Sequence, residues 1–93
     1  MKLDNFTFTE HMRLATLSTK DGVTKELNII SYNGYPPKYD LRGWNNTSSR
    51  IMQKGLTLTA SELSLLKQAI DSIADAEGNI PEPKDVLRAR GIT

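Results

Sequence analysis

Aromatic and basic side chains alternate in the middle of the chain in a pattern that suits nucleic-acid binding. Residues 38–44 alternate as a β-strand does, which places Asp40, Arg42 and Trp44 on one face. An exposed aromatic ring stacks on the flat side of any base, and guanidinium or ammonium groups pair with phosphates. Because duplex DNA hides the flat sides of its bases, such a surface favours single strands. The spacing therefore predicts a single-strand-binding sheet face around Arg42 and Trp44.

Further candidates for this face lie on the neighbouring strand and near the strand ends. Tyr32 and Asn28 belong to one alternating set of the preceding strand, and two aromatic rings come together if that set joins the same face. Lys38 and Lys54 near the strand ends would then surround the rings with positive charge. The alternative interpretation is that Trp44 and Tyr32 are packing residues, as isolated aromatic side chains more often are.

Catalysis and metal binding lack a suitable set of residues. The chain has no cysteine and a single histidine, His11, which excludes a disulfide scaffold, a thiolate zinc site and a histidine-rich metal site. Glu10 and His11 are neighbours in a predicted strand, so their side chains point to opposite faces. The sequence contains neither a phosphate-binding glycine loop nor a nucleophile elbow. We therefore expect no enzyme, no catalytic residue, no metal and no cofactor, and we assign Asp40 to an ion pair with a basic neighbour.

Length and charge indicate one small domain with an uneven charge distribution. The 93 residues are 38% hydrophobic, so the core is modest and a partner chain would add stability. Residues 1–59 carry eight positive and five negative side chains, whereas residues 60–93 carry four positive and six negative ones. The basic N-terminal part and the acidic C-terminal part suggest that one surface binds a polyanion, although solvated charges would give the same pattern.

The expected compartment follows from what the sequence lacks. No run approaches the roughly 18 apolar residues that span a membrane, and residues 1–10 have no apolar signal core. We expect a cytoplasmic protein without a membrane partner, at a bacterial nucleoid or in a phage-infected host.

Hydrophobic periodicity predicts an α+β fold, with four strands followed by one long helix. The turn signals are Asp21-Gly22, Asn33-Gly34 and Pro36-Pro37, and a polar loop follows Trp44. The expected strands are residues 6–14, 24–33, 38–44 and 55–58. In the first strand the apolar residues Phe6, Phe8, Met12 and Leu14 lie at even positions, and the alternation breaks at Leu17, which indicates a bulge or the end of the strand.

The period then changes to that of a helix. Apolar residues recur at intervals of three and four from Leu63 to Ile73, after a capping-box signature at residues 59–62. Gly78 is the expected helix stop, and a short terminal helix is expected at residues 86–90 with Pro83 near its first turn. We divide the chain into a binding domain, residues 1–78, and an extension, residues 79–93.

A homodimer is expected because the helix has apolar residues on two sides. One side of the stripe can pack on the sheet of its own chain. The other side would remain exposed unless a second helix covered it in a symmetric pair. We assign Leu65, Ala69 and Ile73 to this interface.

Three separated blocks resemble the transcriptional positive cofactor four family, and in particular its bacterial and phage branch. The blocks are KELNIISYNG (residues 25–34), PKYDLRGW (residues 37–44) and KGLTLT (residues 54–59), in the family's order and spacing before a helix. The match covers most of residues 6–74.

The resemblance implies a homodimer of curved antiparallel sheets whose helices pair, binding single-stranded DNA, and often RNA, with little sequence preference. Tyr32 and Trp44 match the family's stacking aromatics. The family's basic positions match Arg42, Lys38, Lys54 and Lys25. The serine-rich acidic region of the human coactivator has no counterpart here, which argues against a coactivator role in RNA polymerase II transcription.

Two functions therefore stand as hypotheses. The first is a sequence-nonspecific single-stranded nucleic-acid-binding protein in replication, repair, recombination or transcription regulation. The alternative is a dimeric interaction module that recruits a polymerase or a replication partner through residues 79–93. The sequence leaves the process, the DNA or RNA preference and the role of the extension open.

Overall fold

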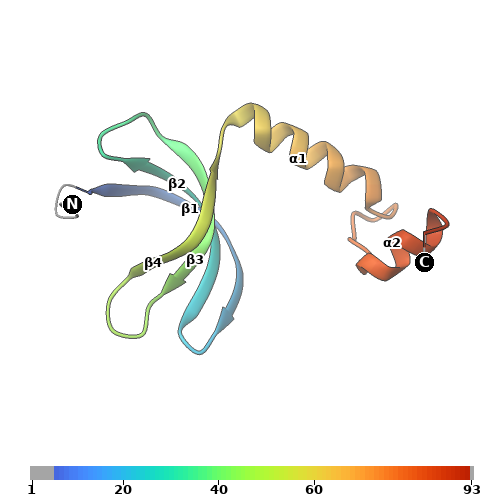
Figure 1. Ribbon diagram of the computed structural model, residues 1–93, viewed down its shortest axis with the longest axis horizontal. Coiled ribbons are helices and arrows are strands. Elements are labelled where there is room, and N and C mark those ends of the chain that lie inside the picture. The colour runs from blue at the N-terminus through green and yellow to red at the C-terminus, as the bar shows by residue number, and fades with distance from the viewer. Residues whose placement is uncertain (1–5, 93) are drawn as a thin grey trace. The chain divides into compact units, whose positions relative to one another are not determined.

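The computed structural model describes residues 6–92, and it has the expected α+β order of a sheet followed by helices (Figure 1). The four antiparallel strands lie in the order β1-β2-β3-β4 and form a curved open sheet. The chain divides into two compact units, one up to Ala60 and one from Ser61 onward. The strands are β1 (Phe8–Lys20), β2 (Val23–Tyr32), β3 (Lys38–Asn45) and β4 (Ile51–Leu58), and the helices are α1 (Ala60–Ile73) and α2 (Pro83–Ala89).

Tight turns at the predicted positions set the strand pairing. Asp21 and Gly22 join β1 to β2 with φ angles of 51° and 79°, so both adopt the left-handed conformation that a two-residue hairpin requires. The turn pairs Lys20 with Val23 directly across the hairpin. The predicted Asp21-Gly22 turn is therefore confirmed, and it fixes which residues of β1 and β2 share a face.

The first strand is longer and more irregular than the alternation predicted. β1 continues to Lys20 instead of ending near residue 14, and its register shifts three times. The first shift follows Glu10, so Met12 pairs with Ile29 and lies on the opposite face from Phe8. The prediction that the apolar even positions share one face was wrong, because each bulge inserts a residue and reverses the faces that follow.

The fourth strand also begins earlier than expected. β4 starts at Ile51, which pairs with Asn45, and Met52 pairs with Trp44. A further shift lies between the pairs of Arg42 and Trp44, where β4 has an extra residue opposite Gly43. Pairing with β3 therefore extends into residues that the sequence assigned to a loop.

One face of the sheet is largely apolar, as the alternation of β3 and β4 predicted. Tyr39 pairs with Leu58, and Leu41 pairs with Leu56. Directly opposed residues share a face, so these four side chains lie together. Leu56 is half exposed. The packing of the helical stripe against this face stays a prediction.

The helix begins where the capping signature predicted and ends earlier than expected. α1 covers residues 60–73 and does not reach Gly78. Asp75 redirects the chain, because its carboxylate accepts hydrogen bonds from the N–H groups of Glu77 and Asn79, both at 2.9 Å. Such local bonding competes with the helical ladder. Gly78 lies in this turn with a φ of 85°.

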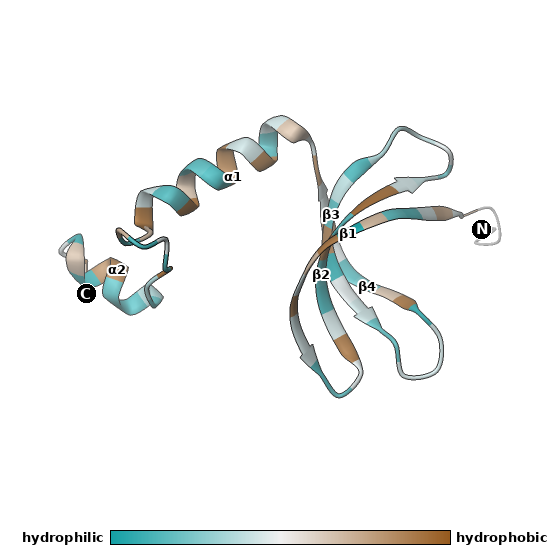
Figure 2. Ribbon diagram, turned by 180° about the vertical axis from the view of Figure 1, so that it is seen from behind, coloured by the Kyte–Doolittle hydropathy of each residue, from teal (hydrophilic) through white to brown (hydrophobic). Residues whose placement is uncertain are grey.

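The terminal helix begins three residues earlier than expected. α2 covers Pro83–Ala89, and Pro83 occupies its first turn as predicted. Hydrophobic residues recur along α1 in Figure 2, and Leu65 is 64% exposed. No helix within residues 6–92 is long and apolar enough to cross a membrane.

Gly55 permits the close approach of β4 to Arg42. The two residues pair directly, and a Cβ at Gly55 would overlap the Cβ of Arg42 and come within 2.5 Å of the Leu41 carbonyl oxygen. Gly43, the other strand glycine, has only ordinary contacts at 3.6 Å or more. Of these two strand glycines, Gly55 alone is therefore required for steric reasons.

We predict that Gly55→Ala lowers the free energy of unfolding by about 2 kcal/mol or more, because backbone and side-chain atoms would have to shift. Gly43→Ala, the matched control, should change it by less than about 1 kcal/mol. Urea denaturation followed by circular dichroism measures both. Equal effects at the two positions would contradict the steric explanation.

Candidate nucleic-acid interface

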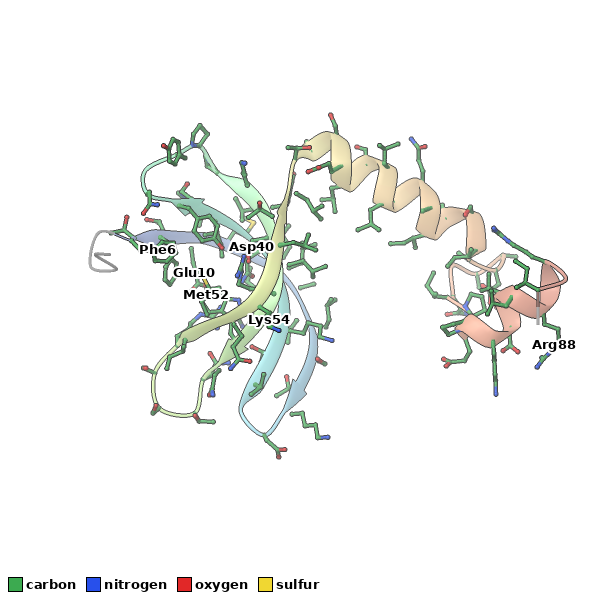
Figure 3. The ribbon with its side chains drawn as sticks, viewed as in Figure 1. Phe6, Glu10, Asp40, Met52, Lys54 and Arg88 are labelled. Carbon is green, nitrogen blue, oxygen red and sulfur yellow. The ribbon has the colours of Figure 1, made fainter. Side chains whose placement is uncertain are left out.

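The face opposite the apolar one is a hollow filled with charged and aromatic side chains. Register places Glu26, Asn28 and Tyr32 of β2 on the same face as Asp40, Arg42 and Trp44 of β3. Figure 3 shows Phe6, Glu10, Asp40 and Met52 gathered on this inner side of the curved sheet. We call this face the hollow; it also includes Phe8, Arg13 and Arg50.

Trp44 is fully buried in the hollow, with 0% of its surface exposed. The guanidinium carbon of Arg50 lies 4.1 Å from the centroid of the indole, and the ring of Phe8 lies 5.7 Å away. The prediction that the sheet displays Trp44 was therefore wrong. Phe8 of β1 and Arg50 of the β3–β4 connection cover the ring, and alternation within β3 carries no information on either.

Arg42 is bound to Asp40 and is not a free cation. Its Nε and Nη2 donate to the two carboxylate oxygens of Asp40 at 2.7 and 2.8 Å, and Nη1 donates to the Gln53 carbonyl at 3.0 Å. The expected ion pair of Asp40 with a basic neighbour is confirmed. The hydrogen bond to Asp40 raises the pKa of Arg42.

Tyr32 completes this cluster. Its hydroxyl donates to Asp40 at 2.6 Å, and Arg42 lies 5.8 Å from the centroid of its ring. Burial and the hydrogen bond to Asp40 raise the pKa of Tyr32, so the phenol remains a neutral donor. The structure thus brings the predicted residues Tyr32 and Arg42 together, in a satisfied polar cluster of the sheet.

Glu26 is a second buried carboxylate, and Arg50 is its main partner. Arg50 Nη2 lies 2.7 Å from Glu26, and Thr24 and Asn28 donate to Glu26 at 2.6 and 3.0 Å. Arg13 adds an ion pair with Glu26 at 3.2 Å. Burial opposes ionisation, but the hydrogen bonds and the charge of Arg50 outweigh it and lower the pKa of Glu26 to about 2.

Arg50 also reaches β1 and thereby ties the β3–β4 hairpin to the far edge of the hollow. It contacts both carboxylate oxygens of Glu10, at 2.6 and 2.7 Å, and donates to Asn46 at 2.9 Å. Hydrogen bonds to Glu10 and Glu26 raise the pKa of Arg50. Sequence reasoning missed Arg50, because its partners are 24 and 40 residues away along the chain.

Two buried polar atoms of the hollow have no hydrogen-bond partner within residues 6–92. They are Nε1 of Trp44 and Oδ1 of Asn28. Buried polar atoms are normally paired, so each is an exception that calls for a physical reason. Both belong to residues that the sequence assigned to nucleic-acid binding.

Exposed lysines gather away from the hollow. A groove of about 820 Å³ at the β1–β2 hairpin is lined by Lys20, Lys25 and Lys54, with Gly43 between the strands and Asp21 at the turn. Within residues 6–92, none of the three lysines forms an ion pair with another described residue. The structure therefore brings predicted Lys25 and Lys54 together and separates them from Trp44.

Lys38 lies at a third place, beside the β2–β3 turn. It lines a pocket of about 270 Å³ with Tyr32, Tyr35 and Pro36. Tyr35 is 69% exposed, although the sequence analysis did not select it. Lys20 was also missed, but hairpin geometry could have placed it across from Val23.

Within the described part of the chain, no group of three or more acidic and histidine side chains could hold a metal ion.

We predict that acid weakens the fold through Glu26. Its pKa is about 2 when folded, against an ordinary value of 4.5, so the unfolded chain binds the proton more readily. Glu26 should therefore contribute up to about 3 kcal/mol above pH 4.5, and this contribution should be lost as the pH falls towards 2. The measurement is urea denaturation of wild type and Glu26→Gln from pH 7 to 2.

The difference in unfolding free energy between these two proteins should shrink below pH 4.5. Asp71→Asn, which removes an exposed carboxylate of α1, should instead follow the wild type. A constant difference between wild type and Glu26→Gln would show that Glu26 is not held ionised by the hollow.

No family model matches the chain. An uncharacterized protein of Treponema pallidum (strain Nichols) is 40% identical to it over 72 residues, which cover 76% of this chain and 84% of the relative. Identity at this level over most of both chains indicates a common fold. The chain belongs to the same family as this uncharacterized Treponema protein.

Proposed function

We propose that the protein binds single-stranded nucleic acid without sequence preference, in DNA replication, repair, recombination or transcription regulation. The observation that carries the proposal is the groove lined by Lys20, Lys25 and Lys54, none of which forms an ion pair with another residue in the range 6–92. The resemblance of residues 25–34, 37–44 and 54–59 to the positive cofactor four family supports the same function.

The electrostatics of the sheet favour this assignment of the phosphate contacts. In the hollow, Arg13, Arg42 and Arg50 are all paired with carboxylates. A phosphate backbone gains most where ammonium groups have no other partner, since it then releases condensed counterions without breaking an ion pair. The lysine groove meets this condition.

We predict that changing Lys20, Lys25 and Lys54 together to glutamine weakens oligothymidine binding and reduces its salt dependence. Each phosphate contact to a single strand contributes about 0.7 to the slope of log K against log salt, so the slope should fall by about 2. Fluorescence anisotropy titrations at several salt concentrations measure this slope.

The matched control changes three cations of the helical segment, Lys67, Lys84 and Arg90, to glutamine. It removes the same charge and should leave the slope nearly unchanged. A slope that falls equally in both triple variants would indicate net charge rather than the groove, and an unchanged slope in the groove variant would contradict the proposed phosphate contacts.

We propose that the working form is a homodimer in which α1 pairs with its counterpart. Leu65 is 64% exposed, Ala69 beside it is exposed, and Ile73 is half-buried. An exposed apolar stripe of this kind favours a second copy, because symmetric pairing covers both stripes at once.

We predict that Leu65→Glu converts the protein to a monomer, because the pairing would bury an unpaired carboxylate. Ser64→Glu adds the same charge one residue away, outside the stripe, and should remain dimeric. Light scattering after size exclusion should give twice the chain mass of 10.4 kDa for wild type and control. A wild-type mass of 10.4 kDa would refute the dimer.

A second candidate function, the protein-interaction module, is favoured by exposed apolar residues in the extension. Ile80, Leu87 and Ile92 are each about half exposed. In this alternative, residues 79–93 recruit a polymerase or a replication protein. Deleting these residues separates the two functions, since the interaction module would lose a protein partner while oligonucleotide binding persists.

A further inference from the structure

We infer that Arg50 is a latch over a concealed nucleobase site: its guanidinium occupies the place against Trp44 that a base would take, and a bound single strand displaces it. This inference rests on the proposed single-strand function and concerns how that function is controlled. It assigns to Trp44 a role that the resting conformation hides.

The position of the guanidinium supports an exchange with a base. The group is flat and lies 4.1 Å from the centroid of the Trp44 ring, which is the arrangement of a cation stacked on an indole. A nucleobase is also flat and uses the same ring face. Arg50 and a base therefore compete for one surface.

Two polar atoms of the hollow lack hydrogen-bond partners among the described residues, which a bound base could supply. Trp44 Nε1 is a buried donor without an acceptor, and Asn28 Oδ1 is a buried acceptor without a donor. The edge of a base offers both donors and acceptors. A base that replaced Arg50 could supply partners that the described residues do not.

Arg50 can leave Trp44 without depriving the buried carboxylate of Glu26 of all its partners. Arg50 and Glu10 are partly exposed, with 27% and 30% of their side-chain surface accessible, so an incoming phosphate can reach the pair. Glu26 keeps its hydrogen bonds from Thr24 and Asn28 and its ion pair with Arg13. A phosphate would then take the place of Glu10 as the partner of the released guanidinium.

Trp44 is the single tryptophan, so its fluorescence reports this site directly. The experiment measures acrylamide quenching and oligothymidine affinity for wild type, Arg50→Ala and Arg13→Ala. Arg13→Ala is the matched control, because it removes the same charge and another ion pair of Glu26 without uncovering the ring. Glu10→Gln is a milder variant that loosens Arg50 and keeps every buried charge partner of Glu26.

We expect the quenching constant of free Arg50→Ala to rise at least threefold over that of Arg13→Ala, with Glu10→Gln in between. Glu10→Gln, which keeps the guanidinium available for a phosphate, should also bind oligothymidine at least threefold more tightly than Arg13→Ala. In wild type, the oligonucleotide should change the emission of Trp44. Circular dichroism tests whether each variant is folded. If Arg50→Ala does not fold, the comparison of Glu10→Gln with Arg13→Ala tests the inference.

Two results would overturn the latch. If the variants leave Trp44 as shielded as in wild type, Arg50 does not cover the site. If Glu10→Gln uncovers Trp44 but does not tighten oligothymidine binding, no base uses the exposed ring. Failure of the latch alone is distinct from failure of the proposed function, since in the latter case neither wild type nor any variant binds the oligonucleotide.

Discussion

The buried carboxylate of Glu26 is the constraint on which the sheet depends. An ionised group without contact with water is stable only when it is paired and hydrogen-bonded. Glu26 meets this requirement with Thr24 and Asn28 from its own strand, and with Arg13 and Arg50 from elsewhere. Because Arg50 also binds Glu10, the same interaction joins the β3–β4 hairpin to β1.

This constraint explains the division of the charged residues. The arginines neutralise Glu10, Glu26 and Asp40 inside the hollow, so they are structural cations in the resting protein. Lys20, Lys25 and Lys54, each an ammonium group on a flexible four-carbon chain, line the hairpin groove without an ion pair to another residue of the described range 6–92. We therefore propose that the lysine groove contacts phosphates, whereas the ring of Trp44, which Arg50 covers, contacts bases.

Local patterns predicted most of the fold and only part of the site. The Asp21-Gly22 hairpin and the capping signature before Ala60 have local causes, so a sequence is sufficient to find them. The break in alternation at Leu17 coincides with one bulge of β1, whereas the shift after Glu10, which reverses the face on which Met12 lies, leaves no such signal in the sequence. The end of α1 depends on the turn that the Asp75 carboxylate forms with the N–H of Glu77, and helical periodicity does not reveal such a bond.

Burial of the site could not be predicted in the same way. The pairing of Asp40 with Arg42 follows from alternation within β3 and was foreseen. The covering of Trp44 depends on Phe8 and Arg50, which are brought to it by curvature and by pairs distant in sequence. An alternating strand shows which side chains share a face, but it does not show whether that face is open.

The most direct test of this account is hydrogen exchange of the Trp44 indole N–H in the free wild-type protein, followed by nuclear magnetic resonance. The account predicts exchange much slower than in free tryptophan, because the group is buried beneath Arg50 and Phe8 although it has no hydrogen-bond partner. Exchange as fast as in free tryptophan would show an open ring and would contradict the closed hollow.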